Sequence, residues 1–148
     1  MRILAIASGG GHWEQMMLLR AAFEGAEVMY ITTLPGLPER SGVTSFAYVP
    51  ECNRNDVVKI IHNMVATVRV ILQFRPDVVV STGALPGLIG LAIAKFLFRR
   101  RTVWIDSIAN SAELSLSGRI ARRVSDLWVT QWPEVAAATG AAYLGRVI

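Results

Sequence analysis

The chain has 148 residues, of which 53% are hydrophobic and 18% charged, and its formal net charge is +4. This length suits one domain with a buried core, and the apolar excess suits a surface that meets a membrane or a permanent partner. The positive charge favours anionic partners such as phosphates, nucleic acid or acidic lipid. The single cysteine, Cys52, excludes an internal disulfide and a cysteine-based metal site.

The apolar segments are short. The run from Ile3 to Ala7 is too short for the core of a secretory signal. The longest apolar stretch, 85–98, contains Lys95 and falls short of the roughly 18 apolar residues of a membrane span. We therefore expect neither a secretory signal nor a transmembrane helix.

Apolar strands alternate with helices along the whole chain. We expect strands at 2–7, 27–32, 45–49, 77–81, 102–106, 127–130 and 142–144. We expect helices at 12–24, 55–74, 86–98, 117–124 and 133–138, with Asn55 capping the second, and a loop at 33–42. This order predicts an α/β fold, a Rossmann-like doubly wound parallel sheet spanning residues 1–148 as one domain. In such sheets ligands bind beyond the carboxyl ends of the strands.

A glycine-rich loop follows the first strand, made of Ser8, Gly9, Gly10 and Gly11. Glycines let a ligand approach the backbone closely, and the N–H groups of the next helix then point at an anion. The loop therefore predicts a phosphate site, with a tight turn that binds nothing as the alternative. A dinucleotide fingerprint is absent, because Glu14 stands where its third glycine belongs and the second strand ends without an acidic residue.

His12 stands at the start of the helix after these glycines. The positive end of a helix disfavours a charged imidazolium, so a neutral ring is expected near pH 7. A neutral ring can take a proton from a hydroxyl group, which makes His12 the candidate catalytic base. The alternative is a histidine that only caps the helix or contacts phosphate. His62, inside the long helix, is expected to be structural.

The loop after the strand at 77–81 has the same design, with candidate binding residues Thr82, Gly83, Ala84, Pro86 and Gly87. Two glycine-rich turns on neighbouring strands would bring two helix starts to one cleft. Together they predict an extended ligand that carries phosphate.

The loop after the strand at 102–106 is rich in hydrogen-bonding side chains. Its candidate binding residues are Asp106, Ser107, Asn110, Ser115 and Ser117. Sugars and diphosphates are recognised by such groups. The alternative is a solvated loop in which Ser115 or Ser117 caps the next helix.

Basic side chains gather after the helix at 86–98, where Arg99, Arg100 and Arg101 follow one another. Arginines beside exposed apolar surface can bind acidic lipid headgroups, so these three are candidate membrane contacts. The long helix is apolar around much of its circumference. Packing against the sheet accounts for one apolar side of this helix. An interfacial membrane role explains the remaining apolar surface, and burial under a partner subunit or a loop explains it equally well.

Three motifs carry a family resemblance: "ASGGGHWEQMMLL", "VVVSTGALPGL" and "IDSIANSAELSLSGRIARRVSDLWVTQWPE". The chain resembles the acceptor-side subunit of two-part glycosyltransferases, whose eukaryotic member anchors the enzyme that adds the second N-acetylglucosamine to dolichyl diphosphate. Bacterial relatives serve exopolysaccharide and capsule synthesis on undecaprenyl diphosphate. The resemblance implies the N-terminal half of a GT-B fold, with the nucleotide-sugar half supplied by a separate catalytic subunit.

By the same resemblance, the chain would bind a polyprenyl-diphosphate-sugar acceptor and recruit its partner to the cytoplasmic face of the membrane. Attachment would be peripheral. The reaction would invert the anomeric centre of a UDP-sugar, without a metal or other cofactor and without nucleic acid as a partner. The family usually has Glu where Asp106 stands and Arg where Asn110 stands, so the second difference removes a phosphate contact.

Two other functions stay open on the residues alone. A scaffold that only activates and localises a glycosyltransferase would tolerate loss of His12 but not of the arginines. A free-standing nucleotide-binding protein is the weaker alternative, because the third glycine and the ribose-binding acid are missing.

Overall fold

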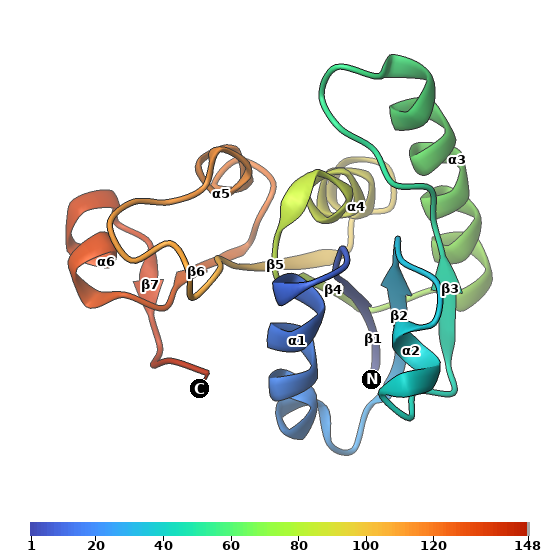
Figure 1. The fold of residues 1–148 in the computed structure, drawn as a ribbon, viewed down its shortest axis with the longest axis horizontal. Helices are drawn as coiled ribbons and strands as arrows, with labels where there is room; N and C mark the ends of the chain where they lie inside the picture. The colour runs from blue at the N-terminus through green and yellow to red at the C-terminus, as the bar shows by residue number, and fades with distance from the viewer. Residues whose placement is uncertain (148) are drawn as a thin grey trace.

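The computed structural model describes residues 1–147, so Ile148, the last residue of the expected domain, lies outside the described residues. Seven parallel strands form one sheet in the order β3-β2-β1-β4-β5-β6-β7. They are β1 (Arg2–Ile6), β2 (Glu27–Thr32), β3 (Phe46–Tyr48), β4 (Val78–Ser81), β5 (Arg101–Ile105), β6 (Leu127–Thr130) and β7 (Ala142–Tyr143). The predicted Rossmann-like doubly wound sheet is confirmed (Figure 1).

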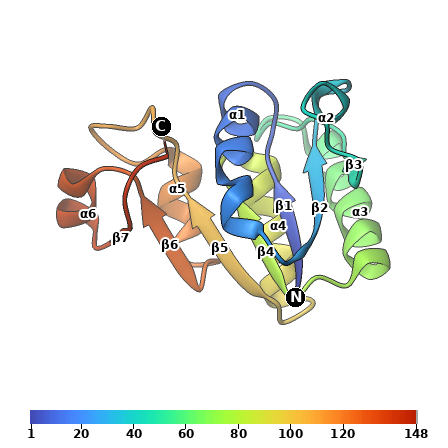
Figure 2. The same ribbon diagram turned by 90° about the horizontal axis from the view of Figure 1, so that it is seen from below.

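Helices connect the strands and cover both faces of the sheet (Figure 2). They are α1 (Gly11–Leu18), the 3₁₀-helix η1 (Leu19–Phe23), α2 (Leu37–Arg40), α3 (Val57–Phe74), α4 (Ala84–Phe96), α5 (Leu116–Ala121) and α6 (Pro133–Thr139). The chain winds from β1 to β3 in one direction and then resumes at β4 on the other side of β1. The order of strands thus reverses between β1 and β4, which is where such sheets bind ligands.

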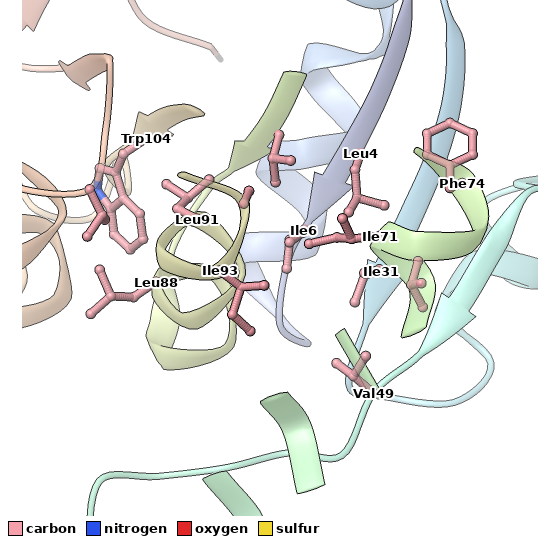
Figure 3. Close-up of a cluster of buried hydrophobic side chains, with 14 of the residues drawn as sticks. Leu4, Ile6, Ile31, Val49, Ile71, Phe74, Leu88, Leu91, Ile93 and Trp104 are labelled. Carbon is pink, nitrogen blue, oxygen red and sulfur yellow. The ribbon is translucent and has the colours of Figure 1, made fainter. Parts of the chain in front are cut away.

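The pleat of β1 sorts its residues between two cores. Leu4 and Ile6 face α3 and α4 and belong to the larger cluster, with Ile71, Leu91 and Trp104 among its members (Figure 3). Ala5 and Ala7 face the other way, into a smaller cluster with Trp13 and Met16 of α1. Alternation along a strand produces this division, and the small alanines leave room for the large side chains of α1.

Several predicted boundaries were wrong. The helix expected at 12–24 divides at Leu19, and the loop expected at 33–42 contains the single turn of α2. The cap of α3 is Asp56 instead of Asn55, because the Asp56 carboxylate accepts a hydrogen bond from Lys59 N at 3.1 Å. Helix α4 begins at Ala84, two residues before the proline expected to open it.

Candidate functional site

The glycine-rich loop joins β1 to α1 at the carboxyl edge of the sheet. Gly10 has φ 69° and ψ −140°, a backbone conformation that strongly favours glycine. No side chain caps α1, and Gly10 and Gly11 are exposed. Ser8 is buried and Gly9 half-buried, and a Cβ added at Gly9 would lie 3.1 Å from the Leu34 side chain. The exposed, uncapped start of α1 is suited to an anion.

The loop after β4 lies next to this one, because β1 and β4 are paired neighbours. Gly83 has φ 143°, and Ala84, the first residue of α4, has φ 63°. Helix α4 also starts without a side-chain cap. The structure thus places two uncapped helix starts side by side, the convergence that the two glycine-rich turns predict (Figure 1).

Two reciprocal hydrogen bonds join these loops through His12 and Thr82. His12 Nδ1 lies 3.0 Å from the carbonyl oxygen of Thr82, and Thr82 Oγ1 donates to the carbonyl oxygen of His12 at 2.7 Å. A carbonyl oxygen only accepts hydrogen bonds, so Nδ1 carries a proton. In the neutral ring Nε2 is then the basic nitrogen, which is the tautomer that a catalytic base requires.

Gly83 provides the space in which the His12 ring lies. A Cβ added at Gly83 would stand 3.2 Å from His12 Nε2 and closer still to Cε1 and Nδ1. Any side chain at this position would displace the ring. Pro86 and Gly87 of the predicted binding set are buried instead, and Gly87 packs against the Ser81 side chain. These two residues allow α4 to approach β4 and present no surface to a ligand.

The third loop, 106–117, is organised around Asp106. This side chain is 0% exposed, and its carboxylate accepts hydrogen bonds from Trp104 Nε1 at 3.0 Å, Asn110 Nδ2 at 2.8 Å and Ser115 Oγ at 2.9 Å. The sequence suggested that Asp106 contacts a ligand. In this structure its carboxylate oxygens are buried and already accept these hydrogen bonds, so they are not open to a ligand. Asp106 instead holds the loop in its conformation.

The other candidate residues of this loop have two kinds of position: Ser115 caps a helix, and the rest lie partly exposed at the surface. Ser115 is the N-cap of α5, since its hydroxyl accepts from Gly118 N at 2.9 Å. This was one of the two roles left open for it. Ser107, Asn110 and Ser117 are each half-buried, and Ser107 accepts from Ala109 N at 3.2 Å.

Gln15 is the residue that sequence reasoning missed. It is 3% exposed on α1, and its side chain donates to Asp106 O at 3.3 Å and accepts from Ile108 N at 3.0 Å. It therefore fixes the third loop to the helix that follows the glycine-rich loop. The sequence signal was slight: one uncharged polar residue between the buried Trp13 and Met16.

Arg99, Arg100 and Arg101 lie at the opposite edge of the sheet. Arg101 is the first residue of β5, and it pairs with Val78 at the start of β4. All three arginines are exposed, as are the neighbouring Phe96 and Leu97 at the end of α4, by 67% and 64%. Within residues 1–147, no three His, Cys, Asp or Glu side chains lie close enough to hold a metal ion.

Helix α3 is long and apolar enough to cross a membrane, judged by length and composition alone. The expectation of short apolar segments considered only 85–98 as the longest apolar stretch and did not include this helix. One of its faces packs against the sheet, with Asn63, Thr67, Val70, Ile71 and Phe74 buried. A core helix of a soluble protein passes the same test of length and composition.

The fold is similar to those of two solved structures, MurG and a UDP-GlcNAc 2-epimerase. Acinetobacter baumannii MurG superposes with a TM-score of 0.71 at 16% identity, over 90% of this chain and 42% of MurG. The UDP-GlcNAc 2-epimerase of Methanocaldococcus jannaschii, in complex with UDP-GlcNAc and UDP, also gives 0.71, at 13% identity over 94% and 42%. At these identities the likeness concerns the fold, and it confirms the expected resemblance to one half of a GT-B enzyme.

Sequence relatives cover part of the chain. The mouse UDP-N-acetylglucosamine transferase subunit ALG14 is 31% identical over 84 residues, 53% of this chain and 39% of the mouse protein. Its namesake from Eremothecium gossypii is 42% identical over 72 residues, 44% of this chain and 31% of the fungal protein. The chain thus matches less than two fifths of either relative's length.

A protein family described as "Oligosaccharide biosynthesis protein Alg14 like" matches residues 47–147, more than half of the chain. The match includes the second and third loops, and the resemblance noted in the motifs is confirmed. The chain therefore belongs to the family of Alg14-like oligosaccharide biosynthesis proteins.

Proposed function

We propose that this chain is the acceptor-binding subunit of a UDP-sugar-dependent inverting glycosyltransferase. The observation that carries the proposal is the reciprocal pair of hydrogen bonds between His12 and Thr82. It joins the exposed start of α1 to the half-buried start of α4, two uncapped helix ends suited to a diphosphate, and orients a basic nitrogen beside them. The mouse and fungal relatives, described as transferase subunits, support the same reading.

In this proposal the acceptor is a sugar on a polyprenyl diphosphate. Its diphosphate binds to the N–H groups at the starts of α1 and α4, along the exposed backbone of Gly10 and Gly11 and beside the half-buried Ala84. Gly83, which the sequence also suggested for this contact, is buried and its N–H donates to Ser81 Oγ at 3.2 Å, so it acts by giving space to His12. Thr82 is fully buried, so its hydroxyl acts by holding His12 rather than by touching the acceptor. Ser107, Asn110 and Ser117, which are partly exposed, are the groups of the third loop that remain for the acceptor sugar.

His12 supplies the proton transfer. The acceptor hydroxyl oxygen attacks the anomeric carbon of the UDP-sugar, and its proton passes to His12 Nε2. The bond from the anomeric carbon to the UDP oxygen breaks, and UDP leaves with the electron pair. Attack from the side opposite UDP inverts the anomeric centre. The donor site belongs to a separate catalytic subunit, which binds this chain at the membrane.

The location that fits this substrate is the cytoplasmic face of a membrane, with peripheral attachment. Acidic lipid attracts basic side chains that lie beside exposed apolar surface. The chain has this combination in the exposed Arg99, Arg100 and Arg101 and the neighbouring exposed Phe96 and Leu97. Exopolysaccharide and lipid-linked oligosaccharide synthesis are the processes in which such an acceptor occurs.

The test is transfer of radiolabelled sugar from a UDP-sugar, beginning with UDP-N-acetylglucosamine, to a polyprenyl-diphosphate-sugar in membranes. Activity should require both this chain and a co-expressed partner. His12→Ala should lower the rate by roughly 100-fold or more. Dependence on the partner alone would overturn the proposal.

His12→Asn is the matched variant, since an amide can still donate to the Thr82 carbonyl but has no basic nitrogen. It should lose activity as His12→Ala does. If His12→Asn keeps full activity, His12 only positions the loops, and if His12→Ala also keeps it, the chain is a scaffold that activates its partner.

A further inference from the structure

Three side chains from other parts of the fold hold the backbone at the start of the third loop. Gln15 of α1 and Gln131, the residue after β6, both donate to Asp106 O, at 3.3 and 3.0 Å. Gln15 also accepts from Ile108 N at 3.0 Å, and Trp132 Nε1 donates to Ile108 O at 2.8 Å. We call Gln15, Gln131 and Trp132 the loop clamp.

The two glutamines of the loop clamp are buried. Gln15 and Gln131 are 3% and 2% exposed, so the protein supplies their hydrogen-bond partners in place of water. Each uses both ends of its side chain, since Gln131 accepts from Val147 N at 2.9 Å while it donates to Asp106 O. A buried amide whose donor and acceptor are both bonded fixes the relative position of the elements that it joins. The loop clamp therefore fixes the backbone between Asp106 and Ile108.

The chain after β7 supports the loop clamp from the other side. Arg146 Nε donates to Gln131 O at 3.2 Å, and the Arg146 guanidinium lies 4.1 Å from the centre of the Trp132 ring. A guanidinium over an indole ring is a favourable cation–π contact. Gln131 and Trp132 are thus each held at two points, by the third loop and by the last described residues.

Ser107 lies between the two clamped residues, and its hydroxyl group is free to donate. The side chain is half-buried at the surface, and its Oγ accepts from Ala109 N at 3.2 Å. A hydroxyl group has one proton to donate besides the lone pairs that accept. Within residues 1–147 the structure gives that proton no acceptor, so it is available to an oxygen atom of a ligand.

The loop clamp also connects this hydroxyl group to the candidate base. Gln15 and His12 lie one turn apart on α1. The Gln15 side chain reaches from that helix to the loop that carries Ser107. Groups that orient a substrate act only when their geometry relative to the reacting groups is kept. The position of Ser107 relative to His12 is therefore set by α1 and the loop clamp together.

We propose that Gln15, Gln131 and Trp132 are positioning residues for the acceptor: the loop clamp fixes the Ser107 hydroxyl group relative to His12, and Ser107 donates to an oxygen atom of the acceptor sugar. The inference rests on the proposed function and deepens it by assigning the residues that align the acceptor. Gln15 and Gln131 are buried and act through the loop backbone. Binding of the UDP-sugar is unaffected, because its site belongs to the separate catalytic subunit.

Hydrogen exchange tests the loop clamp without any activity. The Ile108 amide is bonded to Gln15, and Gln131→Met does not remove that bond. If the loop clamp acts as one unit, Gln131→Met should still speed exchange of the Ile108 amide by about tenfold or more, measured by NMR on the labelled full chain. Gln73→Met, at an exposed glutamine of α3, is the matched control and should leave this exchange rate unchanged.

Kinetics of sugar transfer with the co-expressed partner test the positioning. Gln131→Met should raise KM for the acceptor by about three- to tenfold, with kcat and the KM for the UDP-sugar within about twofold. In a Ser107→Ala background, Gln131→Met should have no further effect on the acceptor KM, because the loop clamp acts through that hydroxyl group. Trp132→Phe is the milder variant for both measurements if Gln131→Met does not fold, since it keeps an aromatic ring beside Arg146 and removes the bond to Ile108 O.

Unchanged exchange of the Ile108 amide in a folded clamp variant would overturn the loop clamp. Faster exchange with an unchanged acceptor KM would mean that the clamp only stabilises the loop. An equal rise in acceptor KM in the Ser107→Ala background would mean that it acts through another group, and either result would overturn the positioning of Ser107. If the unmodified chain and its partner transfer no sugar, the proposed function fails and the role toward the acceptor fails with it, whereas the exchange rates still decide whether the loop clamp exists.

Discussion

Replacing Gly83 by alanine tests how closely the backbone of one loop is fitted to the His12 ring. The added Cβ would stand 3.2 Å from His12 Nε2 and closer to Cε1 and Nδ1, and the residue would have to keep φ 143°. Backbone strain of about 1–3 kcal/mol and overpacking of about 1–3 kcal/mol are the two expected costs. We therefore expect Gly83→Ala to lower the free energy of unfolding by about 2–6 kcal/mol.

Urea unfolding followed by tryptophan fluorescence measures this loss. With a denaturant slope of about 2 kcal/mol per molar urea, the midpoint should fall by about 1–3 M. Gly11→Ala is the matched control in the neighbouring loop, because a Cβ at Gly11 meets nothing within 4 Å and the residue begins α1. Its free energy of unfolding should stay the same or rise by up to about 1 kcal/mol, so its urea midpoint should not fall.

A double-mutant cycle with His12→Ala separates the two costs. Without the imidazole ring, Gly83→Ala should cost only the backbone strain, so the two substitutions should couple by about 1–3 kcal/mol. A coupling energy below about 0.5 kcal/mol would refute the reasoning that Gly83 makes room for the ring. Equal midpoints for Gly83→Ala and Gly11→Ala would refute the strain argument as well.

Three further predictions concern residues away from the glycine-rich loops. Asp106→Asn places an amide among hydrogen-bond donors and should destabilise the chain by about 2–4 kcal/mol, with a changed near-ultraviolet circular dichroism signal from Trp104. The hydrogen bond from Lys95 is the main cause that lowers the pKa of Asp126 below 3.8, so this pair stabilises the fold above that pH and loses its effect as the pH falls further. The difference in urea midpoint between the unmodified chain and Lys95→Ala should therefore shrink below pH 3.8. Burial, helped by Glu51, raises the pKa of the Cys52 thiol to about 11, so iodoacetamide at pH 8 should label Cys52 in urea but hardly in the folded chain, as mass spectrometry would show.

The fold could be predicted because its signals are local. Each strand is a short apolar run, each helix has apolar residues at helical spacing, and their strict alternation leaves few arrangements besides a parallel sheet. Boundaries were less certain because neighbouring residues compete for the same role. Asn55 and Asp56 both make good caps, and the choice of Asp56 depends on which side chain reaches Lys59 N.

The sequence by itself determined that glycine-rich turns follow β1 and β4 and that His12 begins a helix, since glycine, histidine and strand patterns are visible one residue at a time. Only the tertiary structure decided what these residues do to one another. Asp106 and Ser107 are adjacent polar residues, yet the carboxylate of Asp106 is buried among donors while Ser107 stays partly exposed. The hydrogen bond that Ile108 N donates to Gln15 joins residues 93 positions apart. One face of α3 packs against the sheet, while several apolar side chains on its other side stay exposed. Such pairings depend on which elements pack together, a property of the whole sheet that no short stretch of sequence contains.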